Sequence, residues 1–255
     1  MPTVPRSDRV AFVVCGALAR EVRAIAANRG WKVALFGVAA THHMRPERIA
    51  PAVERQLRRL VPRFERVVVI YGECGTRGTL DALLQRFNVP RIAGPHCFEM
   101  YAGYTFESTL HERPGTFFLT DFLVRTYQGT VVKGLGLDRF PALKVVYFGN
   151  YTHVVYLAQG NSPTLQAKAQ AIAADLGLPL EVRPTGYGLL DTRLATLMNE
   201  IHADRYRPHV PADSEEDSHG HVSDPVLARH PRAGARQGRR RSRQRPAATT
   251  LSEGD

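Results

Sequence analysis

The chain contains three cysteines, and each lies at or just beyond the end of a run of residues that predicts a β-strand. They are Cys15, Cys74 and Cys97, each within three residues of a glycine that lets the backbone approach a ligand closely. In an open α/β sheet, ligands bind beyond the carboxyl ends of the strands, so we expect the three thiols to converge on one edge. Three thiolates with one open coordination position are typical of catalytic zinc, and they equally suit an iron–sulfur cluster with one exposed iron.

Other interpretations of these cysteines stay open. Free cysteine is among the most buried residue types and often does no more than fill core volume. One of the three could instead be a redox or nucleophilic thiol whose pKa is lowered at a helix N-terminus. The odd number of cysteines argues against structural disulfides. His96 could complete a closed site of three cysteines and one histidine, although adjacent side chains of an extended segment point in opposite directions.

Further polar side chains are expected at the same sheet edge, among them His42 and His43 after the second predicted strand, to which no role is assigned. The candidate acid–base or supporting groups are Glu73, His96 and Asp121, and the candidate substrate contacts are Thr76, Asn150, Tyr151 and Tyr187. Asp121 could instead only cap a helix, because aspartate accepts the free N–H groups of a first turn. The loop at 72–78 has the glycines of a phosphate-binding loop, but it lacks the lysine of a P-loop and the G-x-G-x-x-G spacing.

Apolar runs alternate with segments of helical periodicity from Arg9 to about Ala203. The expected strands are Arg9–Cys15, Lys32–Phe36, Arg66–Tyr71, Arg91–Ala93, Thr116–Phe118, Lys144–Phe148 and Glu181–Arg183. The expected helices are Ala17–Asn28, Pro46–Val61, Thr76–Phe87, Ser162–Leu176 and Tyr187–Ile201. Several of these strands are apolar on both faces, which is typical of a parallel sheet covered by helices on both sides. We therefore predict an α/β fold, a doubly wound three-layer sandwich with a mostly parallel sheet.

The periodicity stops near Arg207, which divides the chain into an α/β domain at 9–206 and an Arg-rich tail at 207–255. The tail has few apolar residues and blocks of charge, so we expect it to be disordered. The net charge of +10 arises mainly in the domain, because residues 211–255 hold eight arginines and seven acidic residues. Many of the domain's arginines lie on predicted amphipathic helices without a nucleic-acid-binding module, so we do not expect the domain to bind nucleic acid. The run at 239–243 could contact a polyanion weakly.

The cellular location is predicted from segments that the sequence lacks. No apolar run approaches the ~20 residues of a transmembrane helix, so we expect no membrane partner. The N-terminus lacks the apolar core and small-residue cleavage site of a signal peptide. We therefore expect a cytoplasmic protein that acts on, or binds, a small molecule.

A series of motifs resembles an uncharacterised family, domain of unknown function 1638. The motifs, in order, are CGALARE at 15–21, YGECGTRGTLD at 71–81, GPHCFEMYAG at 94–103, PGTFFLTDFLVR at 114–125, GLGLDRFP at 134–141, YFGNYTHVVYLAQ at 147–159 and TGYGLL at 185–190. The resemblance covers roughly residues 10–200 and leaves out the tail. The chain departs from the family pattern at Glu73, where aspartate is expected, and this change keeps the carboxylate.

The resemblance brings no established activity with it. It implies that the three cysteines lie inside the family's motif blocks, which favours the metal site, and it implies an association with corrinoid-dependent methyl transfer. Three hypotheses follow. The first is an enzyme with a zinc or iron–sulfur site that acts on thiols or methyl groups. The second is a non-enzymatic protein that binds or delivers a metal or a corrinoid. The third is a metal-free enzyme with a cysteine nucleophile.

Overall fold

The computed structural model describes residues 7–203 and 206–212. They belong to one compact unit that spans Met1–Ala212. Residues 206–212 have no regular structure, but two hydrogen bonds tie them to the rest of this unit: Asn88 donates to the carbonyl of Arg207, and the N–H of His209 donates to Phe87. The predicted tail begins within this stretch, and from residue 213 onward it lies outside the described residues.

The first half of the chain builds a parallel sheet with strand order β2-β1-β3. Its strands are β1 (Ser7–Cys15), β2 (Val33–Val38) and β3 (Phe64–Ile70). In the central register, Phe12 of β1 pairs with Leu35 on one side and with Val68 on the other. Residues 10–15 of β1 and 67–70 of β3 are all buried, as expected for strands that helices cover on both faces.

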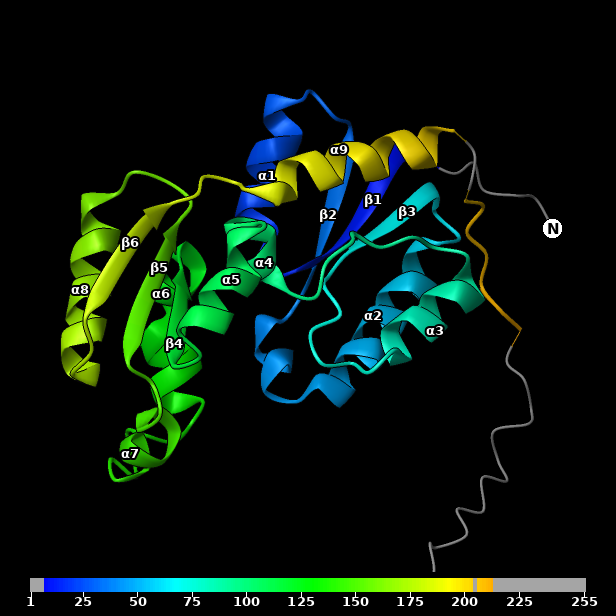
Figure 1. The fold of residues 1–255 in the computed structure, drawn as a ribbon. Coiled ribbons are helices and arrows are strands. Elements are labelled where there is room, and N and C mark those ends of the chain that lie inside the picture. Colours follow the sequence, from blue (N-terminus) through cyan, green and yellow to red (C-terminus); the bar gives the residue numbers. More distant parts are fainter. Residues whose placement is uncertain (1–6, 204–205, 213–255) are drawn as a thin grey trace, which may run out of the picture. The chain divides into compact units, whose positions relative to one another are not determined.

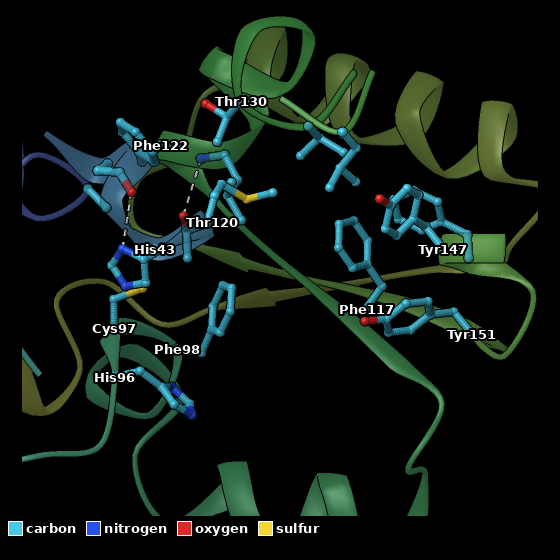
Figure 2. A pocket seen from close by; sticks show the side chains of 17 residues that line it. His43, His96, Cys97, Phe98, Phe117, Thr120, Phe122, Thr130, Tyr147 and Tyr151 are labelled. Carbon is cyan, nitrogen blue, oxygen red and sulfur yellow. Dashed lines mark hydrogen bonds between the residues drawn. The ribbon is translucent and has the colours of Figure 1, made fainter. Parts of the chain in front are cut away.

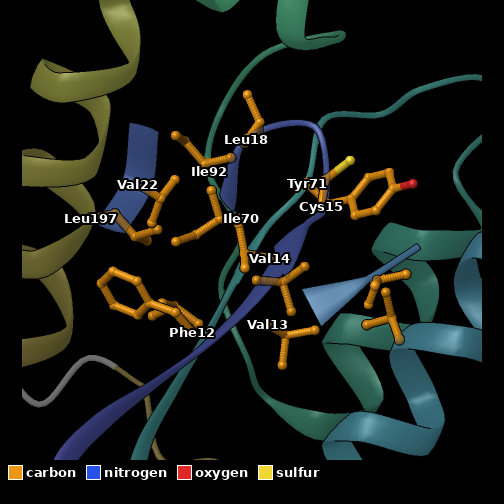
Figure 3. Packing of buried hydrophobic residues seen from close by; sticks show 14 of the residues in the cluster. Phe12, Val13, Val14, Cys15, Leu18, Val22, Ile70, Tyr71, Ile92 and Leu197 are labelled. Carbon is orange, nitrogen blue, oxygen red and sulfur yellow. The ribbon is translucent and has the colours of Figure 1, made fainter. Parts of the chain in front are cut away.

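Helices cover both faces of this sheet (Figure 1). One face carries α1 (Ala19–Asn28) and α9 (Leu189–His202), and the other carries α2 (Ile49–Leu60) and α3 (Thr79–Phe87). Figure 3 shows how β1 divides its side chains, because Phe12 lies on the side of Val22 and Leu197 while Val13 points the other way. The carboxyl end of β1 carries Cys15, which lies near Tyr71 at the edge of this core.

The second half builds another parallel sheet, with strand order β4-β5-β6. Its strands are β4 (Thr116–Thr120), β5 (His153–Ala158) and β6 (Leu180–Pro184), and its packed helices are α6 (Asp121–Tyr127) and α8 (Pro163–Leu176). On β6, the carboxylate of Glu181 accepts hydrogen bonds from Arg183 and, at 2.8 Å, from Arg113. The chain then returns to the first half, where α9 packs against α1 and against α4 (Cys97–Ala102).

Shorter elements connect these parts, and some of them line the candidate site. They are the 3₁₀ helices η1 (Ala40–Met44) and η2 (Pro46–Arg48), the helices α5 (Thr105–Glu112) and α7 (Leu143–Phe148), and the π-helical segment η3 (Gln128–Lys133). Among the described residues, none of the helices combines the length and the apolarity that crossing a membrane requires.

The α/β class and the parallel strands are confirmed, and the strands fall into two sheets of three rather than into a single sheet. The strand predicted at Lys144–Phe148 was wrong, because this run forms α7, on which Val145 and Val146 are exposed. A short apolar run has no periodicity that separates strand from helix. The strand at β5 was not anticipated, and at Arg91 the predicted strand is only an isolated bridge to Val69.

Candidate functional site

Cys15 lies at the carboxyl end of β1 and is 2% exposed. Three donors contact its sulfur: the hydroxyl of Tyr71 and the backbone N–H groups of Ala17 and Leu18, which lead into α1. Burial nevertheless dominates and raises the pKa of the Cys15 thiol. The group is therefore a protonated thiol near pH 7.

Cys74 lies in the loop after β3 and has a left-handed backbone, with φ of 50°. Two backbone hydrogen bonds join this loop to the segment before α4, since the N–H of Cys74 donates to Pro95 at 2.7 Å and that of Glu73 donates to Gly94 at 3.2 Å. The loops approach so closely that a Cβ at Gly72 would meet the backbone of Pro95 at less than 3.0 Å. These contacts bring the segments that carry Cys74 and Cys97 together.

Cys97 is the first residue of α4 and is half-buried. Burial, followed by the charges of Cys15 and Cys74, raises the pKa of its thiol. Burial and the charges of Cys15 and Glu73 likewise raise the pKa of Cys74 to about 12. The pKa of Tyr71 is raised by burial first and then by the charges of all three cysteines. The three thiols thus share one electrostatic neighbourhood around Tyr71, which we call the thiol cluster.

The thiol cluster has the donor chemistry of a soft-metal site but not its closed geometry. Among residues 7–203 and 206–212, no three His, Cys, Asp or Glu side chains are arranged as a group that could hold a metal ion. All three cysteines are free thiols. Protonated thiols are not metal ligands, and a metal that binds these thiols must replace their protons.

Glu73 and Thr76 stabilise the loop that carries Cys74. The Glu73 carboxylate accepts hydrogen bonds from the N–H groups of Gly75 (2.8 Å) and Gly78 (3.4 Å), and from the hydroxyl of Thr76 (2.9 Å). Burial alone would raise the pKa of Glu73, but these hydrogen bonds outweigh it and lower the pKa. Glu73 is therefore an ionised carboxylate that is hydrogen-bonded to residues of its own loop.

Asp121 and Tyr187 line a cavity of about 300 Å³ at the carboxyl edge of the second sheet. We call it the polar cavity, and Arg20, Glu21, Asp121, Arg125, Asn161 and Tyr187 are among its lining residues. Asp121 is 4% exposed and accepts hydrogen bonds from Tyr156 (2.6 Å), Arg125 (2.9 Å) and the N–H of Gln159 (3.1 Å). Burial raises the pKa of Glu21, which lies 4.0 Å from Arg125.

A largely apolar cavity of about 300 Å³ adjoins the thiol cluster (Figure 2). We call it the aromatic cavity, and its rings are those of Phe98, Phe117, Phe122, Tyr147, Phe148 and Tyr151. Cys97 lines it together with His43 and His96, so it is the cysteine that the thiol cluster and this cavity share. The aromatic cavity and the polar cavity have no lining residue in common.

The predicted site residues therefore divide among several places. His96 and Tyr151 join Cys97 in the aromatic cavity, whereas Asn150 is exposed and lines neither cavity. His96 is also the N-cap of α4, where its Nδ1 accepts the N–H of Glu99 at 3.4 Å. Burial, followed by the charge of His43, lowers the pKa of His96 despite the opposing effect of Glu99.

Three residues of this region were not among the predicted site residues. The ring of His43 stacks on Tyr71 with centroids 5.6 Å apart, and its Nδ1 lies 3.2 Å from the carbonyl of Ala40. His43 Nε2 and the hydroxyl of Tyr101 are the two buried side-chain polar atoms that have no hydrogen-bond partner within the described part of the chain. The pKa of Tyr101 is raised by burial first and then by the charges of Glu21 and Cys97.

Comparison with known proteins adds one finding. Residues 38–194 match the model of a family described as "Protein of unknown function (DUF1638)". The chain belongs to this family. The match covers more than half of the chain and includes Cys74 and Cys97, while Cys15 precedes it. No curated protein and no solved structure matches the chain.

Proposed function

We propose that Cys15, Cys74 and Cys97 hold a soft metal centre, zinc or an iron–sulfur cluster, and that the protein uses it in thiol or methyl-group chemistry. One observation supports the proposal: the only three cysteines of the chain come from three separate segments, and the charge of each contributes to raising the pKa of Tyr71. The packing of small apolar side chains in a core does not by itself require three cysteines to lie near one another. Thiolate ligands are also the ones that zinc and iron–sulfur clusters favour.

The absence of a closed donor group is compatible with this proposal. The thiols are protonated, and a rotamer change at χ1 moves a cysteine sulfur by about 3 Å. Loss of the protons and attraction to a cation would draw the three sulfurs together. A centre with three protein ligands keeps one position open for water or substrate, which the metal polarises.

The chain's own residues supply the rest of the site. The hydroxyl of Tyr71 and the N–H groups of Ala17 and Leu18 contact the sulfur of Cys15 and favour its charged form. Through Cys97, the open position would face the aromatic cavity, whose apolar wall excludes water. The proposal also places the protein in the cytoplasm, where thiols stay reduced.

The test is metal analysis of the full-length chain purified without oxygen. We expect close to one zinc ion or one cluster per chain, and an absorption spectrum separates the two because only the cluster absorbs visible light. Each of the variants Cys15→Ser, Cys74→Ser and Cys97→Ser should lose most of this metal, while His42→Gln serves as the matched control. Folded, reduced wild-type protein that takes up neither zinc from an excess nor a cluster from an excess of iron and sulfide would refute the proposal.

A second function is favoured by the placement of Cys97 in the aromatic cavity, which the other two cysteines do not line. In this function Cys97 is the nucleophile of a metal-free enzyme, and a base must accept its proton because burial raises the pKa of the thiol. Alkylation distinguishes the two functions. A lone nucleophile predicts that a small apolar alkylating agent modifies Cys97 alone, whereas a metal centre predicts that bound zinc protects all three cysteines.

A further inference from the structure

We infer that the aromatic cavity binds a small, flat, largely apolar ring compound, and that His43 Nε2 accepts a hydrogen bond from an N–H or O–H group of that compound. The inference concerns a ligand rather than a metal, and it holds whether or not the thiol cluster is loaded. It rests on the size and lining of the cavity and on one unpartnered nitrogen.

The size and lining of the cavity set the class of ligand. A cavity of about 150 Å³ lined by apolar side chains is enough to admit benzene. The aromatic cavity, at about 300 Å³, is at the lower end of the range for small-molecule sites and has room for two fused rings. Its rings come from separate parts of the chain, including Phe98 on α4 and Phe117 on β4. Stacked and edge-to-face contacts with such rings favour a flat aromatic ligand.

The polar groups of the cavity single out His43. Several of the others already have hydrogen-bond partners: Thr120 Oγ1 accepts the N–H of Leu123, and His96 Nδ1 accepts the N–H of Glu99. His43 Nε2 is buried and, among the described residues, has no partner. An unpartnered buried nitrogen lowers the stability of the empty protein, which a suitable ligand would restore.

The other nitrogen of His43 decides what that ligand must offer. Nδ1 lies 3.2 Å from the carbonyl oxygen of Ala40, which can only accept, and 3.5 Å from the hydroxyl of Tyr71, which donates to Cys15 and can accept from Nδ1. We therefore assign the proton of the neutral ring to Nδ1. Nε2 is then a pure acceptor, and the ligand must supply the donor. Stacking on Tyr71 holds the ring in this orientation.

The place of His43 also fixes the orientation of the ligand. In Figure 2 the edge of the His43 ring that bears Nε2 is turned toward Cys97, at the thiol end of the cavity. Met44 and Tyr147, by contrast, are 46% and 45% exposed and mark the side open to solvent. A ligand would therefore enter with its apolar rings toward Tyr147 and Tyr151 and its donor group toward His43.

The test compares indole, which has an N–H donor, with indene, which has the same size and shape but no donor. Calorimetry on the metal-free, reduced full-length chain should give an indole dissociation constant below about 1 mM. Indole should bind about five- to tenfold more tightly than indene, the preference that one hydrogen bond to a buried acceptor provides. A wild-type protein that binds neither compound, or binds both equally, overturns the inference.

Two variants locate the site. His43→Phe keeps a ring against Tyr71 and removes the acceptor, so the preference for indole should fall to about one while indene still binds. The matched control is His42→Phe, which lies on the same 3₁₀ helix outside the cavity lining and should keep the preference. Leu123→Trp fills the cavity and should weaken both compounds at least tenfold. Unchanged binding in Leu123→Trp, or an unchanged preference in His43→Phe, overturns the inference, and the wild-type ratio tests it even if His43→Phe does not fold.

Discussion

Replacing Asp121 by alanine should be among the most destabilising single changes in the second half of the chain. The side chain is 4% exposed and accepts three hydrogen bonds, from Tyr156, Arg125 and the N–H of Gln159. These bonds join the first residue of α6 to the middle and the end of β5. Asp121→Ala would leave the donors of the fully buried Tyr156 and of the buried Gln159 without a partner.

The magnitude follows from these contacts. A hydrogen bond to a charged acceptor contributes about 1.5–3 kcal/mol, and each buried donor left unpaired costs about 1–3 kcal/mol. The contribution of Arg125 is discounted because its side chain is 29% exposed and water can replace the lost contact. We therefore expect Asp121→Ala to lower the free energy of unfolding by about 3–5 kcal/mol. Tyr156→Phe, which removes a single donor, should cost about 1–2 kcal/mol.

Urea denaturation followed by circular dichroism measures these changes, with the slope of the transition as a check that the unfolded state is unaltered. The matched control is Asp138→Ala, because Asp138 is exposed and its loss should change stability by no more than about 0.5 kcal/mol. If Asp121→Ala costs less than about 1 kcal/mol, the carboxylate does not hold β5 and α6 together. Its hydrogen bonds would then be incidental to the fold, and a role in the polar cavity would become the better explanation for it.

Three further predictions concern the backbone and the pH dependence of stability. Gly188→Ala should lower the free energy of unfolding by several kcal/mol, because φ is 53° and a Cβ would clash with the carbonyl of Tyr101. The control Gly186→Ala, with φ of 55° and open space around the Cβ, should lower it by only about 1 kcal/mol. Equal losses in the two variants would contradict the clash. Burial raises the folded pKa of Glu21, so the contribution of this group to stability falls as pH rises above the unfolded pKa of 4.5. The stability of Glu21→Gln relative to wild type should therefore increase as pH rises above this value, and a constant difference would count against this reasoning. The two arginines that bind Glu181 lower its pKa from 4.5 to about 2. The stabilisation by this carboxylate is therefore complete above pH ~4.5 and is lost as pH falls toward ~2. Glu181→Gln should remove this acid-dependent part of the stability, and an unchanged acid transition would show that solvent screens the ion pairs.

The placement of the loops that carry Cys15 and Cys74 at one sheet edge follows from topology, whereas a metal-holding arrangement of the three thiols stays a prediction, since the described residues contain no such group. Parallel strands end at one edge of their sheet, and β1 and β3 are neighbours, so residues just beyond their ends are brought together. The segment before Cys97 pairs with β3 only at Arg91, yet that bridge is enough to direct it to the same edge. The bridge at Arg91 and the backbone hydrogen bonds from Glu73 and Cys74 therefore bring this segment beside the loop after β3, although the predicted strand itself is nearly absent.

The rest of the site could not be predicted because it depends on how separate segments pack. Asp121 and Tyr187 also follow strands, but those strands belong to the second sheet, whose carboxyl edge forms the polar cavity. The aromatic cavity combines residues near α4 with residues between 117 and 151, and no spacing in the sequence indicates that contact. His43 was expected just beyond β2, but only the contacts of its Nδ1 with Ala40 and Tyr71 indicate which nitrogen has no partner among the described residues.

The apolar surroundings of Cys97 bear on both proposals. Burial holds its thiol in the protonated form, and a protonated thiol is a poor nucleophile and is slow to oxidise. The sulfur becomes reactive only when a cation replaces the proton or a base removes it, and the aromatic cavity admits apolar molecules more readily than either. A ligand seated against His43 would further shield Cys97 from water and strengthen every charge interaction in the thiol cluster. Ligand binding in the cavity should therefore make the thiols harder to ionise without a metal. A metal and a ring compound would thus have opposite effects on the ionisation of Cys97.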